Sequence, residues 1–180
     1  MFNAETGKQI LDALFNTNKK TNNNYVSFGN TPWLALFTKM PDKNGLNYVE
    51  PSVSAGYVRV LLTNNGAYGK QIMASATTED GTGDHVGKKI AVVKNQDLAT
   101  FPEAREAAFG KIVGFGIFDE NCVSSNGGVI ANPAEKPAIF WGKLGTYDAE
   151  GNFTETTDGI TVDQGEIPIF RIDDLKVYFV

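Results

Sequence analysis

The chain has 180 residues, of which 42% are hydrophobic and 21% are charged. This composition is typical of a globular protein with one domain and one core, and it excludes collagen, coiled-coil, membrane-spanning and wholly disordered chains. The 16 basic and 21 acidic residues give a net charge of −5. That charge argues against nucleic acid or an anionic membrane as the main partner, and we expect no membrane insertion. With one cysteine (Cys122) and one histidine (His85), no intramolecular disulfide and no Cys/His zinc site can form.

Residues 3–15 predict one short amphipathic helix. Asn3 is the expected N-cap, and the helix should end near Asn16, because residues 16–24 are polar and turn-forming. So short a helix is only marginally stable alone and must dock on its own domain or on a neighbouring subunit. The polar residues of this segment argue against an export signal, and the free cysteine fits synthesis in a reducing cytoplasm. One helical stripe carries the apolar residues Ile10, Leu11, Leu14 and Phe15.

From residue 25 onward the pattern changes to the two-residue alternation of β-strands. About seven short apolar runs are separated by clusters of Gly, Pro, Asn and Asp, with almost no helical pattern. This arrangement predicts a mainly β protein, a single β-sandwich of jelly-roll-like type. Residues 1–24 are then the helix and a polar tether, and residues 25–180 are the β-sandwich domain. The expected strands lie at residues 33–38, 57–62, 88–93, 112–118, 138–144, 167–172 and 175–179.

Two segments depart from the strand pattern. Residues 64–87 are the longest weakly patterned region, which we interpret as a protruding loop or a long hairpin. Residues 101–108 begin with Phe-Pro and continue with Glu, Ala and Arg, which predicts a single helical turn between two strands.

Candidate catalytic and metal-binding residues are few. The segment from Asp80 to Asp84 places two carboxylates around two glycines, so a solvated turn is expected and a Ca²⁺ loop is the alternative. His85 has no nearby Ser or Cys nucleophile, which indicates a surface residue rather than a general base. The doublets 119–120 and 173–174 are acidic, but neighbouring strand residues point to opposite faces and cannot flank one sugar. We therefore expect no enzymatic activity, no catalytic residue, no cofactor and no assigned metal site.

The glycines and tryptophans are also interpreted as structural. Residues 110–116 contain a Gly-x-x-x-Gly-x-Gly pattern, but a strand rather than a helix follows it, so a nucleotide-binding loop is not indicated. Gly114 and Gly116 should instead lie on one strand face where a bulky neighbour or a tight bend needs room. Trp33 and Trp141 could stack on a sugar, but each lies in an apolar run, which favours packing in the core.

Several short motifs follow one another in a fixed order along the chain. They are Leu-x-Leu-Phe-Thr-x-x-Pro at residues 34–41, Gly-Tyr-x-Arg at 56–59, Phe-Pro-x-Ala at 101–104, Gly-x-Ile-x-x-x-Gly-Ile-Phe-Asp at 110–119, Gly-x-Leu at 142–144 and Gly-Glu-x-Pro-x-Phe at 165–170. This order resembles a family of small bacteriophage virion proteins that are usually labelled tail fibre proteins. The resemblance covers residues 4–180, and the chain departs from the family at residues 64–87 and 121–137, which are both longer.

The resemblance implies a structural virion protein of a tailed bacteriophage, acting by assembly as a tail or fibre component. Its expected partners are other virion proteins of the tail or capsid and copies of itself, as a trimer by analogy with phage fibres. Its expected location is the virion, after synthesis in the cytoplasm of the host bacterium. Two alternatives stay open: a capsid decoration or head-fibre protein, and a receptor- or carbohydrate-binding module that uses aromatic residues in the long loops. The expected assembly contact is the helical stripe of Ile10, Leu11, Leu14 and Phe15.

Overall fold

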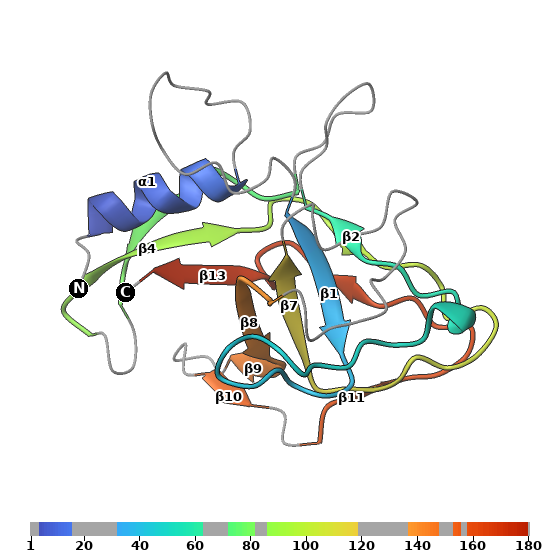
Figure 1. The fold of residues 1–180 in the computed structure, drawn as a ribbon. Helices are drawn as coiled ribbons and strands as arrows, with labels where there is room; N and C mark the ends of the chain where they lie inside the picture. The colour runs from blue at the N-terminus through green and yellow to red at the C-terminus, as the bar shows by residue number, and fades with distance from the viewer. Residues whose placement is uncertain are drawn as a thin grey trace. The chain divides into compact units, whose positions relative to one another are not determined.

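The computed structural model describes residues 4–15, 32–62, 72–81, 86–118, 137–147, 153–155 and 158–179. Within these residues the protein is mainly β, with one short helix at the N-terminal end and several antiparallel sheets (Figure 1). The predicted fold class is thus confirmed, whereas the jelly-roll-like arrangement and the domain boundary at residue 24 stay predictions. The elements are α1 (Ala4–Phe15), β1 (Trp33–Phe37), the 3-10 helix η1 (Val53–Ala55), β2 (Val60–Leu61), β3 (Thr77–Asp80), β4 (Lys89–Lys94), β5 (Ala99–Thr100), β6 (Gly110–Ile112), β7 (Gly114–Phe118), β8 (Phe140–Lys143), β9 (Gly145–Tyr147), β10 (Phe153–Glu155), β11 (Ile160–Val162), β12 (Ile169–Phe170) and β13 (Lys176–Phe179).

The chain divides into two compact units that interleave along the sequence. Unit 1 comprises Met1–Pro32, Leu62–Ala99 and Phe170–Val180. Unit 2 comprises Trp33–Leu61 and Thr100–Ile169. Each unit therefore combines segments that lie far apart in the sequence.

Unit 1 is a three-stranded antiparallel sheet, in the order β13-β4-β3, with α1 packed on it. Figure 1 shows α1 lying along β4. The central strand β4 has four consecutive buried residues, 90–93, so both of its faces are covered. On the helix, Leu11 and Phe15 are fully buried, and the carboxylate of Asp12 accepts a hydrogen bond from the backbone N–H of Ala76 at 2.7 Å.

The predicted helix is confirmed between residues 4 and 15. The sequence left open whether it docks on its own domain or on a neighbouring subunit, and in this structure it docks on the sheet of its own unit. Leu11 and Phe15 are buried there, Ile10 is half-buried, and the side chain of Leu14 lies outside the described residues. Any subunit contact through Leu11 or Phe15 would require α1 to leave this sheet, and the assembly role of the stripe stays a prediction.

Unit 2 is built around a four-stranded antiparallel sheet in the order β2-β1-β7-β8. Strand β1 was predicted at nearly these bounds, and it lies centrally because its run of apolar residues is buried on both faces. It pairs along its whole length with β7, from Trp33 opposite Phe118 to Phe37 opposite Gly114. Two smaller antiparallel pairs, β6 with β11 and β9 with β10, complete the unit.

The glycines of β7 leave space for large side chains, as predicted. A Cβ atom on Gly116 would lie 2.7 Å from Cε2 of Phe37, and one on Gly114 would lie 2.5 Å from the carbonyl oxygen of Gly142 and closer still to Sδ of Met40. Both distances are shorter than real Cβ contacts allow, so only glycine lets these neighbours pack against the strand. The glycine pattern therefore serves close packing in the sheet.

Some predicted elements differ from the observed ones. Residues 101–105 do not form the predicted helical turn, because the N–H groups of Phe101 and Ala104 donate to the carbonyl oxygens of Pro168 and Glu166, both at 2.9 Å. The expected strand at residues 57–62 shrinks to β2, and before it the side chains of Tyr57 and Arg59 bind Glu50. The weakly patterned region contains β3, which pairs with β4 as one arm of a hairpin.

Candidate functional site

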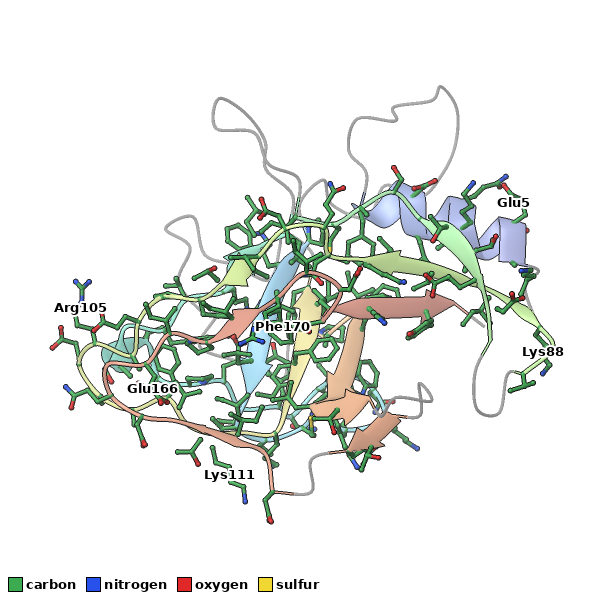
Figure 2. The ribbon with its side chains drawn as sticks, turned by 180° about the vertical axis from the view of Figure 1, so that it is seen from behind. Glu5, Lys88, Arg105, Lys111, Glu166 and Phe170 are labelled. Carbon is green, nitrogen blue, oxygen red and sulfur yellow. The ribbon has the colours of Figure 1, made fainter. Side chains whose placement is uncertain are left out.

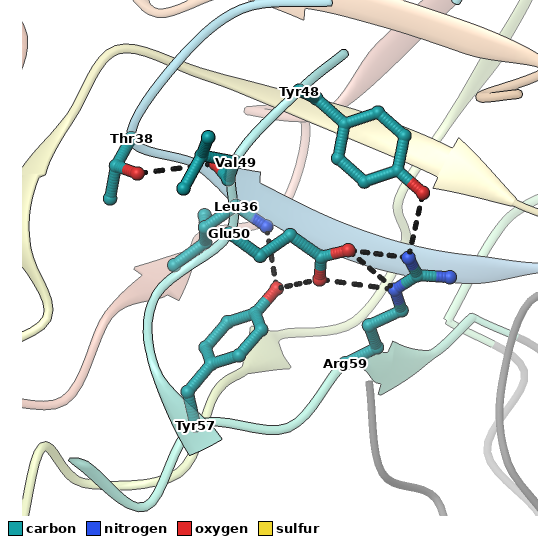
Figure 3. A network of polar contacts seen from close by, with 7 residues as sticks. All are labelled: Leu36, Thr38, Tyr48, Val49, Glu50, Tyr57 and Arg59. Carbon is teal, nitrogen blue, oxygen red and sulfur yellow. Dashed lines mark hydrogen bonds and ion pairs between the residues drawn. The ribbon is translucent and has the colours of Figure 1, made fainter. Parts of the chain in front are cut away.

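Unit 2 holds a cluster of polar contacts around the buried side chain of Glu50 (Figure 3). The side chain of Glu50 is 3% exposed and that of Arg59 is 1% exposed. The Nε atom of Arg59 lies 3.2 Å and 3.1 Å from the two carboxylate oxygens of Glu50, and its Nη2 also bonds Oε1. This is a fork-like pairing of guanidinium and carboxylate, which is the geometry that compensates buried charges best.

Tyr57 joins this ion pair to the backbone of the sheet. Its hydroxyl donates to Oε2 of Glu50 at 3.0 Å and accepts from the N–H of Leu36 at 2.9 Å. Strand β2 pairs only with Trp33 and Leu34 of β1, so it ends before Leu36. The tyrosine hydroxyl therefore satisfies a backbone donor of β1 beyond the end of its partner strand.

Aromatic rings enclose the cluster. The guanidinium carbon of Arg59 lies 3.7 Å from the ring centroid of Phe118, a cation–π contact. Phe118 also packs edge-to-face with Tyr48, and the two ring centroids are 5.1 Å apart. On the other side, the ring of Tyr57 stacks on that of Phe101, with centroids 6.0 Å apart. These rings keep water from the ion pair, which makes its loss costly.

Burial and charge decide the protonation states of the cluster. Burial, together with the negative charge of Glu50, raises the pKa of Tyr57 well above its usual value, so the phenol stays a neutral donor. Burial lowers the pKa of Arg59, but the hydrogen bonds and the charge of Glu50 outweigh it and raise that pKa overall. Arg59 and Glu50 thus form a charged pair that is bound by other side chains of the protein. Through Tyr57 and Phe118, this pair connects residues 48–59 to strands β1 and β7.

Four of the motifs that carry the family resemblance contribute residues to this cluster: Leu36, Tyr57 with Arg59, Phe101 and Phe118. In the Gly-Tyr-x-Arg motif, Tyr57 stacks on Phe101 and Arg59 on Phe118, and both side chains bind Glu50. Gly56 has a φ of +92°, and a Cβ there would lie 3.3 Å from the carbonyl oxygen of Glu103. The carbonyl of Ala104 in turn accepts from the N–H of residue 165 at 2.9 Å. These motifs are therefore packing motifs of unit 2.

The other residues singled out from the sequence have simpler surroundings. Asp80 makes an exposed ion pair with Lys89 at 2.7 Å, whereas residues 82–85, including His85, lie outside the described residues. So do Cys122 and the doublet at 119–120. In the doublet 173–174, the carboxylate of Asp174 accepts from the N–H of Arg171 at 2.7 Å within a turn. Among the residues that the structure describes, no three His, Cys, Asp or Glu side chains gather as a metal site would need.

The two tryptophans lie in different environments. Trp33 is half-buried in β1, whereas Trp141 on β8 is 38% exposed, so the prediction that it packs in the core is wrong. The reason is its position, because β8 is the outer strand of the four-stranded sheet. The sequence prediction also missed Glu50, a single acid in a segment with no charge pattern to mark it.

Alkaline pH should weaken unit 2 through Tyr57. The pKa of Tyr57 is raised in the folded protein, so its contribution to stability is present below about pH 10 and is lost as the pH rises towards the folded pKa. The free energy of unfolding of the parent protein should therefore fall more steeply above about pH 10 than that of Tyr57→Phe, which has no ionisable group there. Urea unfolding at a series of alkaline pH values measures this, with Tyr178→Phe as an exposed control. Equal slopes for the parent and Tyr57→Phe would contradict the assignment.

Comparison with known protein families gives one match. Residues 2–135 match the protein family described as "Podophage GP4 fiber I protein gp80". Neither the curated proteins nor the solved structures gave a significant match. The described part of the chain holds no helix with the length and apolar character needed to cross a membrane. Since the match spans well over half of the 180 residues, the chain belongs to this podophage fibre protein family.

Proposed function

We propose that the protein is a structural subunit of a podophage fibre, most simply a tail component, that acts by assembly and not by catalysis. The family match over residues 2–135 carries this proposal. In it, copies of the chain associate with one another, as a trimer by analogy with phage fibres, and with other virion proteins. The chain is made in the cytoplasm of the host bacterium and functions in the virion.

The chemistry of the described residues supports a structural role. The buried acid of unit 2, Glu50, is bound by Arg59 and Tyr57, so its carboxylate oxygens are used within the fold. The exposed ion pairs, such as Lys143 with Glu155, are ordinary surface pairs. A buried acid whose oxygens are bound within the fold suits a structural role better than a catalytic one.

Two other functions remain to be separated from this one. A capsid decoration or head-fibre protein would use the same fold at another place in the particle. A receptor- or carbohydrate-binding module would use aromatic residues of the long loops, 64–87 and 121–137, most of which lie outside the described residues. Electron microscopy of purified particles, with an antibody fragment or a fused tag on this chain, distinguishes a tail component from a head component. Density on the tail supports the proposal, density on the head supports the second function, and absence from the particle contradicts both.

The proposal also predicts that α1 contributes to assembly. Deleting residues 1–20 should lower the solution mass of the protein towards that of a monomer and prevent its incorporation into particles. The same deletion removes Leu11 and Phe15 from the sheet of unit 1, at about 1.5–3 kcal/mol for each buried side chain, so circular dichroism must first show a folded protein. Mass is measured by light scattering, and incorporation by immunoblotting of purified particles.

A milder variant keeps α1 docked. Glu5 and Gln9 lie on the exposed face of the helix, and changing both to lysine alters only that face. Lys88→Glu is the matched control, because Lys88 is exposed in the same unit, just before β4 (Figure 2). If the deleted protein keeps both its oligomeric mass and its place in the virion, α1 is not the assembly contact.

A further inference from the structure

Met40 places its thioether against the glycines of the sheet in unit 2. Its Sδ atom lies in the space that a Cβ on Gly114 would need, and its Cε would lie 3.1 Å from that Cβ. The carbonyl oxygen of Gly142 on β8 lies 2.5 Å from the same position. The sulfur therefore fills the space that the absent glycine side chain leaves, where β7 and β8 pair.

The Met40 side chain also packs on a buried cluster of aromatic and small residues. The ring centroid of Tyr48 lies 5.1 Å from the centroids of both Phe37 and Phe118. A thioether is flexible and polarisable, so it fills an irregular gap between rings and strand backbone well. The cluster that Met40 partly covers consists of Ala35, Phe37, Tyr48, Phe118 and Ala138.

Exposure distinguishes Met40 from Met73, which lies in unit 1. Met73 is 0% exposed, whereas Met40 is half-buried, so part of the Met40 side chain contacts solvent. An oxidant dissolved in water must reach the sulfur itself, so a fully buried methionine reacts only when the fold around it opens. The two methionines therefore form a matched pair within one chain.

We propose that Met40 is a reversible modification site, at which hydrogen peroxide converts the thioether to methionine sulfoxide. A lone pair of Sδ attacks one peroxide oxygen and the O–O bond breaks. The proton on the transferred oxygen passes to the departing hydroxide, which leaves as water. The sulfur is oxidised by two electrons and the peroxide is reduced by two. A methionine sulfoxide reductase, with a thiol as the reductant, reverses the step.

The sulfoxide does not fit where the thioether lies. Its new oxygen is a hydrogen-bond acceptor, and the space over Gly114 already holds the carbonyl oxygen of Gly142. Phe37 and Phe118 offer no donor, so burying the sulfoxide oxygen beside them costs free energy. The oxidised side chain should therefore turn out into solvent, which leaves an unfilled space over β7 and weakens unit 2. This effect is separate from the assembly proposed above, since it acts within one chain.

Peptide mass spectrometry after graded treatment with hydrogen peroxide measures where oxygen enters the chain. All proteins carry Cys122→Ser, because the thiol of the one cysteine also reacts with peroxide. In the folded protein, Met40 should form sulfoxide about tenfold faster than Met73, and in urea the two rates should become equal. A rate at Met40 in the folded protein that is no higher than the rate at Met73 overturns the proposal.

Variants show whether the Met40 sulfur carries the structural effect. Peroxide should lower the midpoint of thermal unfolding of the parent by about 2–4 °C, and reductase treatment should restore it. Met40→Leu has a similar volume and no sulfur, so its midpoint should not change, whereas the matched control Met73→Leu should lose as much as the parent. An equal loss in Met40→Leu and the parent overturns the proposal, and so does Met40 sulfoxide without a fall in the midpoint. If Met40→Leu does not fold, the reductase experiment on the parent decides, since a midpoint that stays low after the Met40 sulfoxide is removed also overturns it.

Discussion

Replacing Glu50 with alanine is expected to lower the free energy of unfolding by about 3–5 kcal/mol, because it leaves a buried guanidinium without its counter-charge. The side chains of Arg59 and Glu50 are 1% and 3% exposed, so water cannot take the place of the lost carboxylate. Tyr57 loses its acceptor in the same variant. Urea unfolding followed by circular dichroism measures the change.

Two further variants test whether the loss of stability in Glu50→Ala arises because the ion pair is buried. Glu155→Ala breaks the exposed ion pair with Lys143 and should cost no more than about 1 kcal/mol. Replacing both members of the buried pair, as Glu50→Leu with Arg59→Met, should recover much of the loss, because no charge is then left unpaired. If Glu50→Ala is no more destabilising than Glu155→Ala, the cluster does not hold unit 2 together.

Gly116→Ala is expected to destabilise the protein by about 3 kcal/mol or more, because the added methyl group overlaps the ring of Phe37. A Cβ at this position would lie 2.7 Å from Cε2 of Phe37 and 3.2 Å from Cε2 of Phe118. Both rings are fully buried and packed edge-to-face, with centroids 6.1 Å apart, so neither can turn away freely. Thermal or urea unfolding of the variant measures the loss.

A double-mutant cycle tests whether the stability lost in Gly116→Ala comes from the contact with Phe37. Phe37→Leu removes ring atoms from the position of the new methyl group, so it should offset part of the effect of Gly116→Ala, with a coupling energy of about 0.5–3 kcal/mol. Gly87→Ala is the control, since nothing lies within 4 Å of a Cβ there. It should cost only about 1 kcal/mol for its left-handed backbone. Additive effects of Phe37→Leu and Gly116→Ala would contradict the close packing described for β7.

Core and surface variants should affect particle formation differently. Glu50→Ala and Gly116→Ala act through the stability of unit 2, so particles should lose the protein because less of it is folded. Trp141→Ala removes a ring that is 38% exposed and should cost less stability than either of these two buried changes. Yield of folded protein and incorporation into particles, measured together, distinguish a folding defect from the loss of a contact.

Elements whose residues repeat with one clear period were predictable from the amino-acid sequence alone. The helix at residues 4–15 follows from apolar residues three and four apart, and β1 and β4 follow from short β-branched and aromatic runs. The room needed at Gly114 and Gly116 was also predictable, because two glycines on one strand face have few other uses. The order of the motifs along the chain indicates the fibre family, and the family match over residues 2–135 agrees with it.

Features that depend on which segments meet became visible only in the folded chain. Glu50 is buried because residues from β1, β7 and the segment before β2 converge on it, and nothing local marks it among the chain's acids. Residues 101–105 stay extended because a segment more than sixty residues later in the sequence accepts their N–H bonds. Trp141 is exposed because the strand order makes β8 an edge, although its apolar neighbours suggested a core strand. The spacing of apolar residues along a segment predicts which of its side chains are buried. Which strands pair, and in what order, depends on contacts between segments that are distant in the sequence.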